Sequence, residues 1–318
     1  MDRVRMQLGL TDAYLARLHG QPVTIAVLDS GISRHPDLTG ALFAFRDFSG
    51  QSGKGGKRYF YQTPYDDYGH GTHVCGILAG NGALSFGKYQ GICPNARLVV
   101  GKVLDERGDG SVEEMLAGMH WVLETQKQYG TRLLNLSVGI ADLCSRGKEE
   151  KLRAMLEKLT DHGILVLCAA GNKGPAAGSL SFLGESDRVI SVGCHDGEYF
   201  RGDPTRCASH SGRGDRNSVL RKPDIVAPGT RIKSCSGRYQ KGMRTEFAYE
   251  VRSGTSMATP IVTGCLARVL QLEPRLTAKE LKKLLTSTAT DLGEPWNQQG
   301  WGMACPRGML EQVRRGSF

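Results

Sequence analysis

The chain has 318 residues, of which 40% are apolar and 23% are charged, and its formal net charge is +9. This is an ordinary globular composition, and because no run of 18 apolar residues occurs, we expect no membrane span. Lysine and arginine are spread along the chain instead of forming a recognisable binding module, so the positive charge predicts a basic surface and no nucleic-acid partner.

Short apolar, β-branched runs predict buried strands, at residues 23–28, 98–103, 133–136, 164–169 and 189–192. Apolar residues repeat every three or four positions at 111–128 and 148–162, which predicts helices there, and further helices are expected at 70–77, 256–272 and 278–287. The alternation of strands and helices predicts an α/β fold with a mostly parallel central sheet and helices on both faces.

Residues 197–252 are rich in glycine, arginine and serine, and predict loops with short antiparallel strands. We find no internal repeat and no linker. The chain is therefore interpreted as a single domain over 1–318, with a core over about residues 20–290 and a C-terminal extension over 291–318.

The nine cysteines are odd in number, lie far apart and include no C-x-x-C pair. Several stand in apolar runs, such as Cys168 in I-L-V-L-C-A-A. This pattern favours buried free thiols in a reducing cytoplasm over a framework of disulfides.

Two motifs follow a predicted strand or begin a predicted helix and can supply a carboxylate and an imidazole. V-T-I-A-V-L-D-S-G-I ends a strand on Asp29, which can orient a histidine or act as a helix N-cap. Y-D-D-Y-G-H-G-T-H places His70 at the start of a helix. His70 and His73 are three residues apart, whereas the usual zinc pair is four apart with a neighbouring glutamate, so we expect His73 to be a hydrogen-bonded structural residue.

Two further motifs can supply a nucleophile and an oxyanion donor. S-G-T-S-M-A-T-P sets Ser256 at a helix N-terminus, where unpaired N–H groups face a developing negative charge, with Pro260 in the first turn. I-L-V-L-C-A-A-G-N-K-G-P ends a buried strand at Asn172, whose amide can donate to an oxyanion. Alternatively, Ser256 is an N-cap and Asn172 belongs to a turn.

Together these four strings resemble the subtilisin-like serine proteases, and P-Y-D-D-Y-G-H-G-T-H is most similar to an intracellular bacterial branch, the AprX type. The resemblance implies a three-layer sandwich fold and an endopeptidase of broad specificity acting on proteins or peptides. It implies that Asp29 orients His70, that His70 is the general base and that Ser256 is the nucleophile. Asn172 and the Ser256 N–H would form the oxyanion hole.

The resemblance also implies where substrate lies. An extended peptide would pair with two segments, Gly108–Asp109–Gly110 and Ser137–Val138–Gly139. The floor of the primary pocket falls near Ser181, and Ala170–Gly171–Asn172 forms a wall opposite the second segment. These residues are small and uncharged, so we expect apolar side chains before the scissile bond, unless Glu185 or Asp187 turns inward.

The sequence departs from secreted subtilisins in ways that bear on location and metal binding. Only 28 residues precede Asp29, which leaves no room for a long inhibitory propeptide, and we expect a cytoplasmic protein. We expect the chemistry to require no cofactor. Asp37 keeps the position of one family calcium ligand and is a weak candidate for structural calcium. The rival interpretation is a catalytically silent subtilisin-fold protein that binds or regulates a partner.

Overall fold

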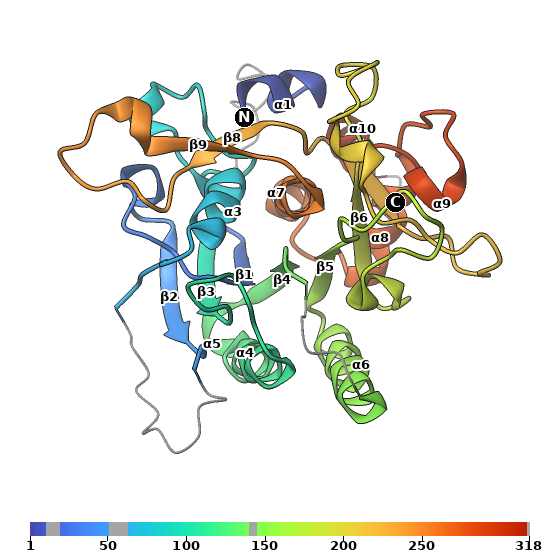
Figure 1. Cartoon of the computed structure of the whole chain (residues 1–318), viewed down its shortest axis with the longest axis horizontal. Helices are drawn as coiled ribbons and strands as arrows, with labels where there is room; N and C mark the ends of the chain where they lie inside the picture. Colours follow the sequence, from blue (N-terminus) through green and yellow to red (C-terminus); the bar gives the residue numbers. More distant parts are fainter. Residues whose placement is uncertain (11–19, 51–62, 140–144, 317–318) are drawn as a thin grey trace.

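The computed structural model describes residues 1–10, 20–50, 63–139 and 145–316. A sheet of seven strands forms its centre, in the order β2-β3-β1-β4-β5-β6-β7, and every neighbouring pair is parallel (Figure 1). The strands are β1 (Thr24–Asp29), β2 (Leu42–Asp47), β3 (Arg97–Lys102), β4 (Thr131–Leu136), β5 (Leu165–Ala169), β6 (Ile190–Cys194) and β7 (Ile225–Ala227).

Helices pack on both faces of this sheet, as predicted (Figure 1). One face carries α3 (His70–Ala79), α7 (Thr255–Leu272), α8 (Ala278–Ser287) and α10 (Pro306–Arg314), and the other carries α4 (Val112–Glu124) and α6 (Arg146–Asp161). Because helices cover both faces, every residue of the central strand β1 is buried. Short helices complete the chain, namely α1 (Asp2–Gln7), α5 (Gln126–Tyr129) and α9 (Trp296–Gln299).

The five predicted strands are confirmed, and two further strands of the sheet were missed. β2 is an edge strand whose residues are mostly only partly buried, so it has no continuous apolar run. β7 has three residues and lies within 197–252, which we had expected to hold loops and antiparallel strands only. The antiparallel pair predicted there is present as β8 (Ile232–Cys235) and β9 (Tyr249–Arg252), packed against α3.

The predicted helices are confirmed, with one division. The segment 111–128 forms α4 and α5, separated at Thr125, whose hydroxyl donates to the carbonyl of Trp121. At the C-terminus, Met303 pairs with Val226 of β7, and α10 buries apolar side chains in the core around α7. The division of the chain into one core with a C-terminal extension stays a prediction.

Candidate active site

Asp29 and His70 form a pair at the carboxyl edge of the sheet. Asp29 ends β1 and is fully buried, and His70 begins α3 with its side chain 14% exposed. The Oδ1 atom of Asp29 lies 2.7 Å from Nδ1 of His70 and accepts a hydrogen bond from the Ser30 N–H at 2.8 Å. Because a carboxylate at Nδ1 holds a proton there, Nε2 is the ring nitrogen left to act as a base.

Asp66 holds the first turn of the helix that carries His70. Its Oδ1 accepts hydrogen bonds from the Gly69 N–H at 2.7 Å and the Ser30 hydroxyl at 2.8 Å, and its Oδ2 accepts from the Thr72 N–H at 2.8 Å. N–H groups in a first helical turn lack partners within the helix, so this carboxylate caps α3. We assigned Asp66 no role from the sequence, although an acidic residue just before a helix is a typical capping signal.

Ser256 is the second residue of α7 and is partly buried, as expected for a helix N-terminus. The unpaired N–H groups and the positive end of the helix dipole lie at this position. Pro260 was expected in the first turn but is the sixth residue of the helix, inside α7. A proline there has no N–H to donate to the carbonyl of Ser256.

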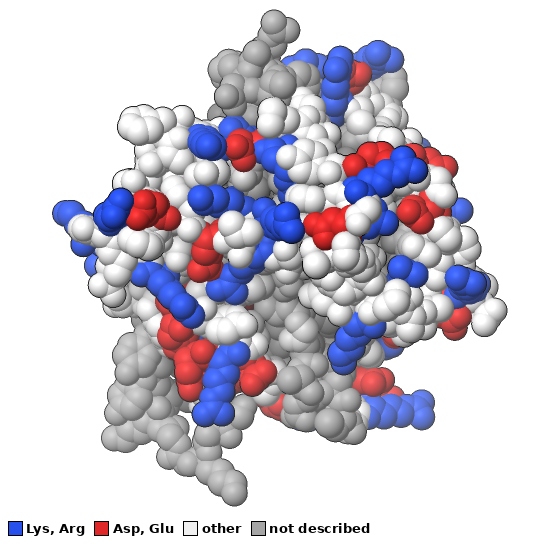
Figure 2. All heavy atoms as spheres, turned by 45° about the horizontal axis from the view of Figure 1, so that its top comes forward, with Lys and Arg blue, Asp and Glu red and all other residues white. Residues whose placement is uncertain are grey.

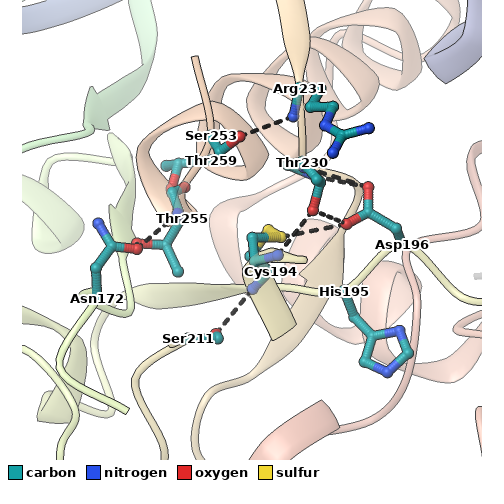
Figure 3. Close-up of a disulfide and its surroundings, with 12 residues drawn as sticks. Asn172, Cys194, His195, Asp196, Ser211, Thr230, Arg231, Ser253, Thr255 and Thr259 are labelled. Atoms are coloured by element: carbon teal, nitrogen blue, oxygen red, sulfur yellow. Dashed lines mark hydrogen bonds between the residues drawn. A yellow bond between two sulfur atoms is a disulfide. The ribbon is translucent and has the colours of Figure 1, made fainter. Parts of the chain in front are cut away.

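Asn172 reaches the same helix end from the segment after β5. Its Oδ1 accepts hydrogen bonds from the Thr255 N–H at 3.0 Å and the Thr255 hydroxyl at 3.2 Å (Figure 3). Two donors on the amide oxygen leave its NH₂ group as the free end. Gly254 precedes this turn with φ +140, and a Cβ there would lie 3.2 Å from the Asn172 amide nitrogen, so glycine permits the close approach.

The two predicted substrate-binding segments follow β3 and β4, the strands on either side of β1. Gly108 has φ +82, and a Cβ there would lie 2.6 Å from the ring of Tyr68, which therefore requires glycine. Asp109 is exposed, and its carbonyl accepts from the Asp105 N–H at 2.8 Å, which closes the turn that contains Gly108. Gly139 faces open space.

A cavity of 420 Å³ adjoins Ser256 and Asn172. The residues that line it are Val138, Gly139, Ala169, Gly171, Asn172, Lys173, Ser179, Leu180, Ser181, Phe182, Leu183, Thr255 and Ser256. Two residues predicted for its walls, Ser137 and Ala170, do not line it, because both are buried behind the surface. Neither Glu185 nor Asp187 is among the lining residues, and both are exposed.

His73 is a structural residue, as expected, and not half of a metal pair. It is completely buried in α3, and its Nε2 lies 3.1 Å from the carbonyl of Ile232 in β8. Burial, with the positive charge of Arg252 nearby, lowers the pKa of His73 from 6.5 to about 3.

This shift predicts how stability depends on pH. Between pH 6.5 and about 3, unfolded His73 takes up a proton that the folded protein excludes, so stability falls as pH falls through this window. His73→Gln should reduce the slope of unfolding free energy by up to about 1.4 kcal/mol per pH unit near pH 5. Denaturant unfolding at several pH values measures the slope. His120→Gln, at an exposed position, is the control, and equal slopes in all three proteins would contradict the prediction.

Two protein groups donate hydrogen bonds to Asp37, the weak candidate for a structural calcium ligand. Its Oδ1 accepts from the Leu84 N–H at 2.9 Å, and its Oδ2 accepts from the Tyr249 hydroxyl at 2.6 Å. Asp37 is 1% exposed. Each carboxylate oxygen thus has one protein donor and keeps a lone pair, and a calcium site would need six to eight oxygen ligands around the ion, so Asp37 stays a weak candidate.

The expectation of free thiols is wrong for one pair, because Cys194 at the end of β6 and Cys207 form a disulfide (Figure 3). The carboxylate of Asp196 beside this disulfide accepts hydrogen bonds from the N–H and hydroxyl of Thr230. The remaining cysteines in the described part of the chain are free thiols, and all are buried except the partly exposed Cys305.

The parallel sheet, with a paired aspartate and histidine beside a serine-bearing helix N-terminus, is the architecture of the subtilisin-like serine proteases. The solved structures with a similar fold include two proteases. The chain matches sphericase with a TM-score of 0.76 and 26% identity, and an S41 psychrophilic protease with 0.74 and 28%, covering 90% of this chain and 92% of the other in both cases.

The chain belongs to the subtilase family, whose model matches residues 20–302. It is 38% identical over 279 residues to serine protease AprX of Bacillus subtilis (strain 168), covering 84% of this chain and 61% of AprX. It is 34% identical over 290 residues to subtilisin Savinase of Lederbergia lenta, covering 90% of each chain. The chain thus spans about three fifths of the length of AprX.

Proposed function

We propose that this protein is a serine endopeptidase that hydrolyses proteins through an acyl-enzyme on Ser256. The observation that carries the proposal is the 2.7 Å contact between Asp29 and His70 at the sheet edge where the Ser256 helix begins. Membership of the subtilase family supports it. The alternative, a catalytically silent subtilisin-fold protein, has no observation in its favour, because Asp29, His70, Asn172 and Ser256 are all present.

In the proposed reaction, the Ser256 hydroxyl attacks the peptide carbonyl carbon while His70 Nε2 takes its proton. The oxyanion that forms accepts hydrogen bonds from the Asn172 amide and the Ser256 N–H. His70 then gives its proton to the leaving amine as the C–N bond breaks. A water molecule then attacks the acyl-enzyme in the same way, with His70 again taking and giving the proton, and the carboxylic acid product leaves Ser256. Every proton transfer has a side-chain partner, so the chemistry is proposed to need no cofactor.

A fluorophosphonate, which reacts with activated serines, tests the proposal. The protein should be labelled in a 1:1 ratio, and Ser256→Ala should remove the label, as intact mass spectrometry would record. Ser253→Ala is the matched control. This exposed serine lies three positions before Ser256 and accepts a hydrogen bond from the Arg231 N–H (Figure 3). A folded protein that does not label would support the silent alternative.

The cavity predicts the specificity of this endopeptidase. Ser181 lies in its lining with Leu180, Phe182 and Leu183, and none of the described lining residues is aspartate or glutamate. Without a carboxylate, the cavity has no ion-pair partner for lysine or arginine, and Lys173 repels them. We expect cleavage after Leu, Phe, Tyr or Met, each preferred by about 1 to 3 kcal/mol. Profiling with a mixed peptide library measures this preference, and dominant cleavage after Arg or Lys would contradict it.

The substrates are proposed to be proteins or peptides in an extended conformation. Among the described residues of the face in view, Figure 2 shows acidic and basic side chains intermixed, without a continuous basic tract of the kind that nucleic acid requires. Within the described residues, no helix combines the length and apolar character that a membrane crossing needs.

A bacterial cytoplasmic location is also proposed, on the resemblance to the AprX type. The disulfide between Cys194 and Cys207 argues against it, since such bonds persist mainly in oxidising compartments. Cell fractionation decides the location. The protein can be denatured and alkylated directly in cell extract, and its free thiols counted. The count shows whether the Cys194–Cys207 disulfide exists in the cell.

A further inference from the structure

Lys102 is a fully enclosed lysine beside the candidate catalytic aspartate. It ends β3, pairs in register with Asp29 on β1, and is only 1% exposed. Its ammonium donates to the carbonyl of Ser30 at 3.0 Å, the carbonyl of Leu104 at 2.6 Å and Oδ1 of Asp67 at 2.6 Å. A buried ammonium is costly unless its donors are satisfied, and here all three have acceptors.

Two of these acceptors, Ser30 and Asp67, belong to the segments that carry the Asp29–His70 pair. Ser30 directly follows Asp29, and Asp67 lies three residues before His70. The ammonium therefore joins the turn after β1 to the turn before α3 from a third element, β3. The Ser30 hydroxyl makes a second connection between the same turns, because it accepts from the Gly71 N–H at 2.9 Å.

We propose that Lys102 is a positioning residue that sets the distance between Asp29 and His70. The inference deepens the proposed function and rests on it. Lys102 is buried away from solvent and donates only to protein atoms, so its effect passes through the two turns. A displacement of 1 Å in a catalytic group can cost about 100-fold in rate, so a small shift of either turn has a large effect on turnover.

The chain contains a matched control in Lys222. This lysine is 5% exposed, and its ammonium also donates to two backbone carbonyls, of Ser186 and Val189, and to one carboxylate, of Asp224. Its partners connect β6 and β7, at the opposite end of the sheet from β3. Removing either ammonium should therefore lower the stability of the protein. Only the removal of the Lys102 ammonium should also lower turnover.

The experiment compares Lys102→Met with Lys222→Met on a peptide anilide substrate. We expect Lys102→Met to lower kcat by about 10- to 100-fold with KM changed less than threefold. Lys222→Met should keep kcat within threefold of the parent while losing a comparable amount of thermal stability. An unchanged kcat in folded Lys102→Met, or equal losses in both variants, would overturn the proposal.

Two variants of Asp67 decide the matter if Lys102→Met does not fold. Asp67 is 38% exposed, so its replacement removes no core side chain. Asp67→Ala removes the acceptor for the ammonium and should lower kcat, whereas Asp67→Asn keeps an acceptor oxygen and should lose less. Equal kcat values for parent and Asp67→Ala would overturn the proposal.

A spectroscopic measurement separates positioning from general loss of structure. The proton between His70 Nδ1 and Asp29 should give a far-downfield proton resonance, and Lys102→Met should shift or broaden it, while Lys222→Met should not. An unchanged resonance in Lys102→Met would contradict the proposal. A parent protein that neither cleaves peptide nor takes up fluorophosphonate would instead refute the proposed function, so the two failures are distinguishable.

Discussion

Replacing Ser256 with alanine is expected to lower kcat by about 10⁶, the size of loss found for the corresponding subtilisin residue. The physical reason is that Asp29, His70 and Ser256 would act as one unit. The 2.7 Å contact between Asp29 and His70 would orient His70 to take the proton of Ser256. The double variant with His70→Ala should therefore lose little more than either single variant. Steady-state kinetics on one peptide substrate measure all three.

Contaminating protease is the main source of error at such low rates, so each variant should be titrated with fluorophosphonate first. Ser253→Ala should retain kcat close to the parent value. Losses that multiply in the double variant would show that Ser256 and His70 act independently, which the unit model does not allow.

Asn172→Ala is expected to lower kcat by about 10² to 10³ with little change in KM, a magnitude known from a subtilisin oxyanion-hole asparagine. Thr255 donates twice to the amide oxygen of Asn172, so the NH₂ group is oriented before substrate arrives. An interaction that strengthens only as negative charge develops on the substrate affects kcat, not KM.

Two further variants sharpen this result. Asn172→Asp should be at least as damaging as Asn172→Ala, because a carboxylate repels the oxyanion. Asn297→Ala serves as control, since that buried amide donates to the carbonyl of Gly214 in a different part of the molecule. A loss confined to KM in Asn172→Ala would make Asn172 a residue that binds substrate in the ground state.

The positions of the candidate catalytic residues within their elements were predictable from local patterns. Asp29 follows the apolar run of a predicted strand, and His70 and Ser256 stand where predicted helices begin, as the structure places them. In a parallel sheet with helices between strands, such ends meet at one edge. The contact between Asp29 and His70, 41 positions apart in the chain, is consistent with that rule.

Other features depend on which distant residues share a contact, and no local pattern contains that information. The hydroxyl of Tyr249 donates to the carboxylate of Asp37 from 212 positions away in the chain. Ser137 and Ala170 belong to the predicted wall segments, yet the packing buries them behind the cavity.

The sequence by itself determined the family, the parallel α/β architecture and the strand and helix ends that carry Asp29, His70, Asn172 and Ser256. These follow from hydrophobic periodicity and short motifs, which neighbouring residues specify together. Only the tertiary structure decided the enclosure of Lys102, the pairing of Cys194 with Cys207 and the shape of the cavity. Each of these depends on how closely separate segments approach once the core is packed, and on which acceptors a buried charge then finds.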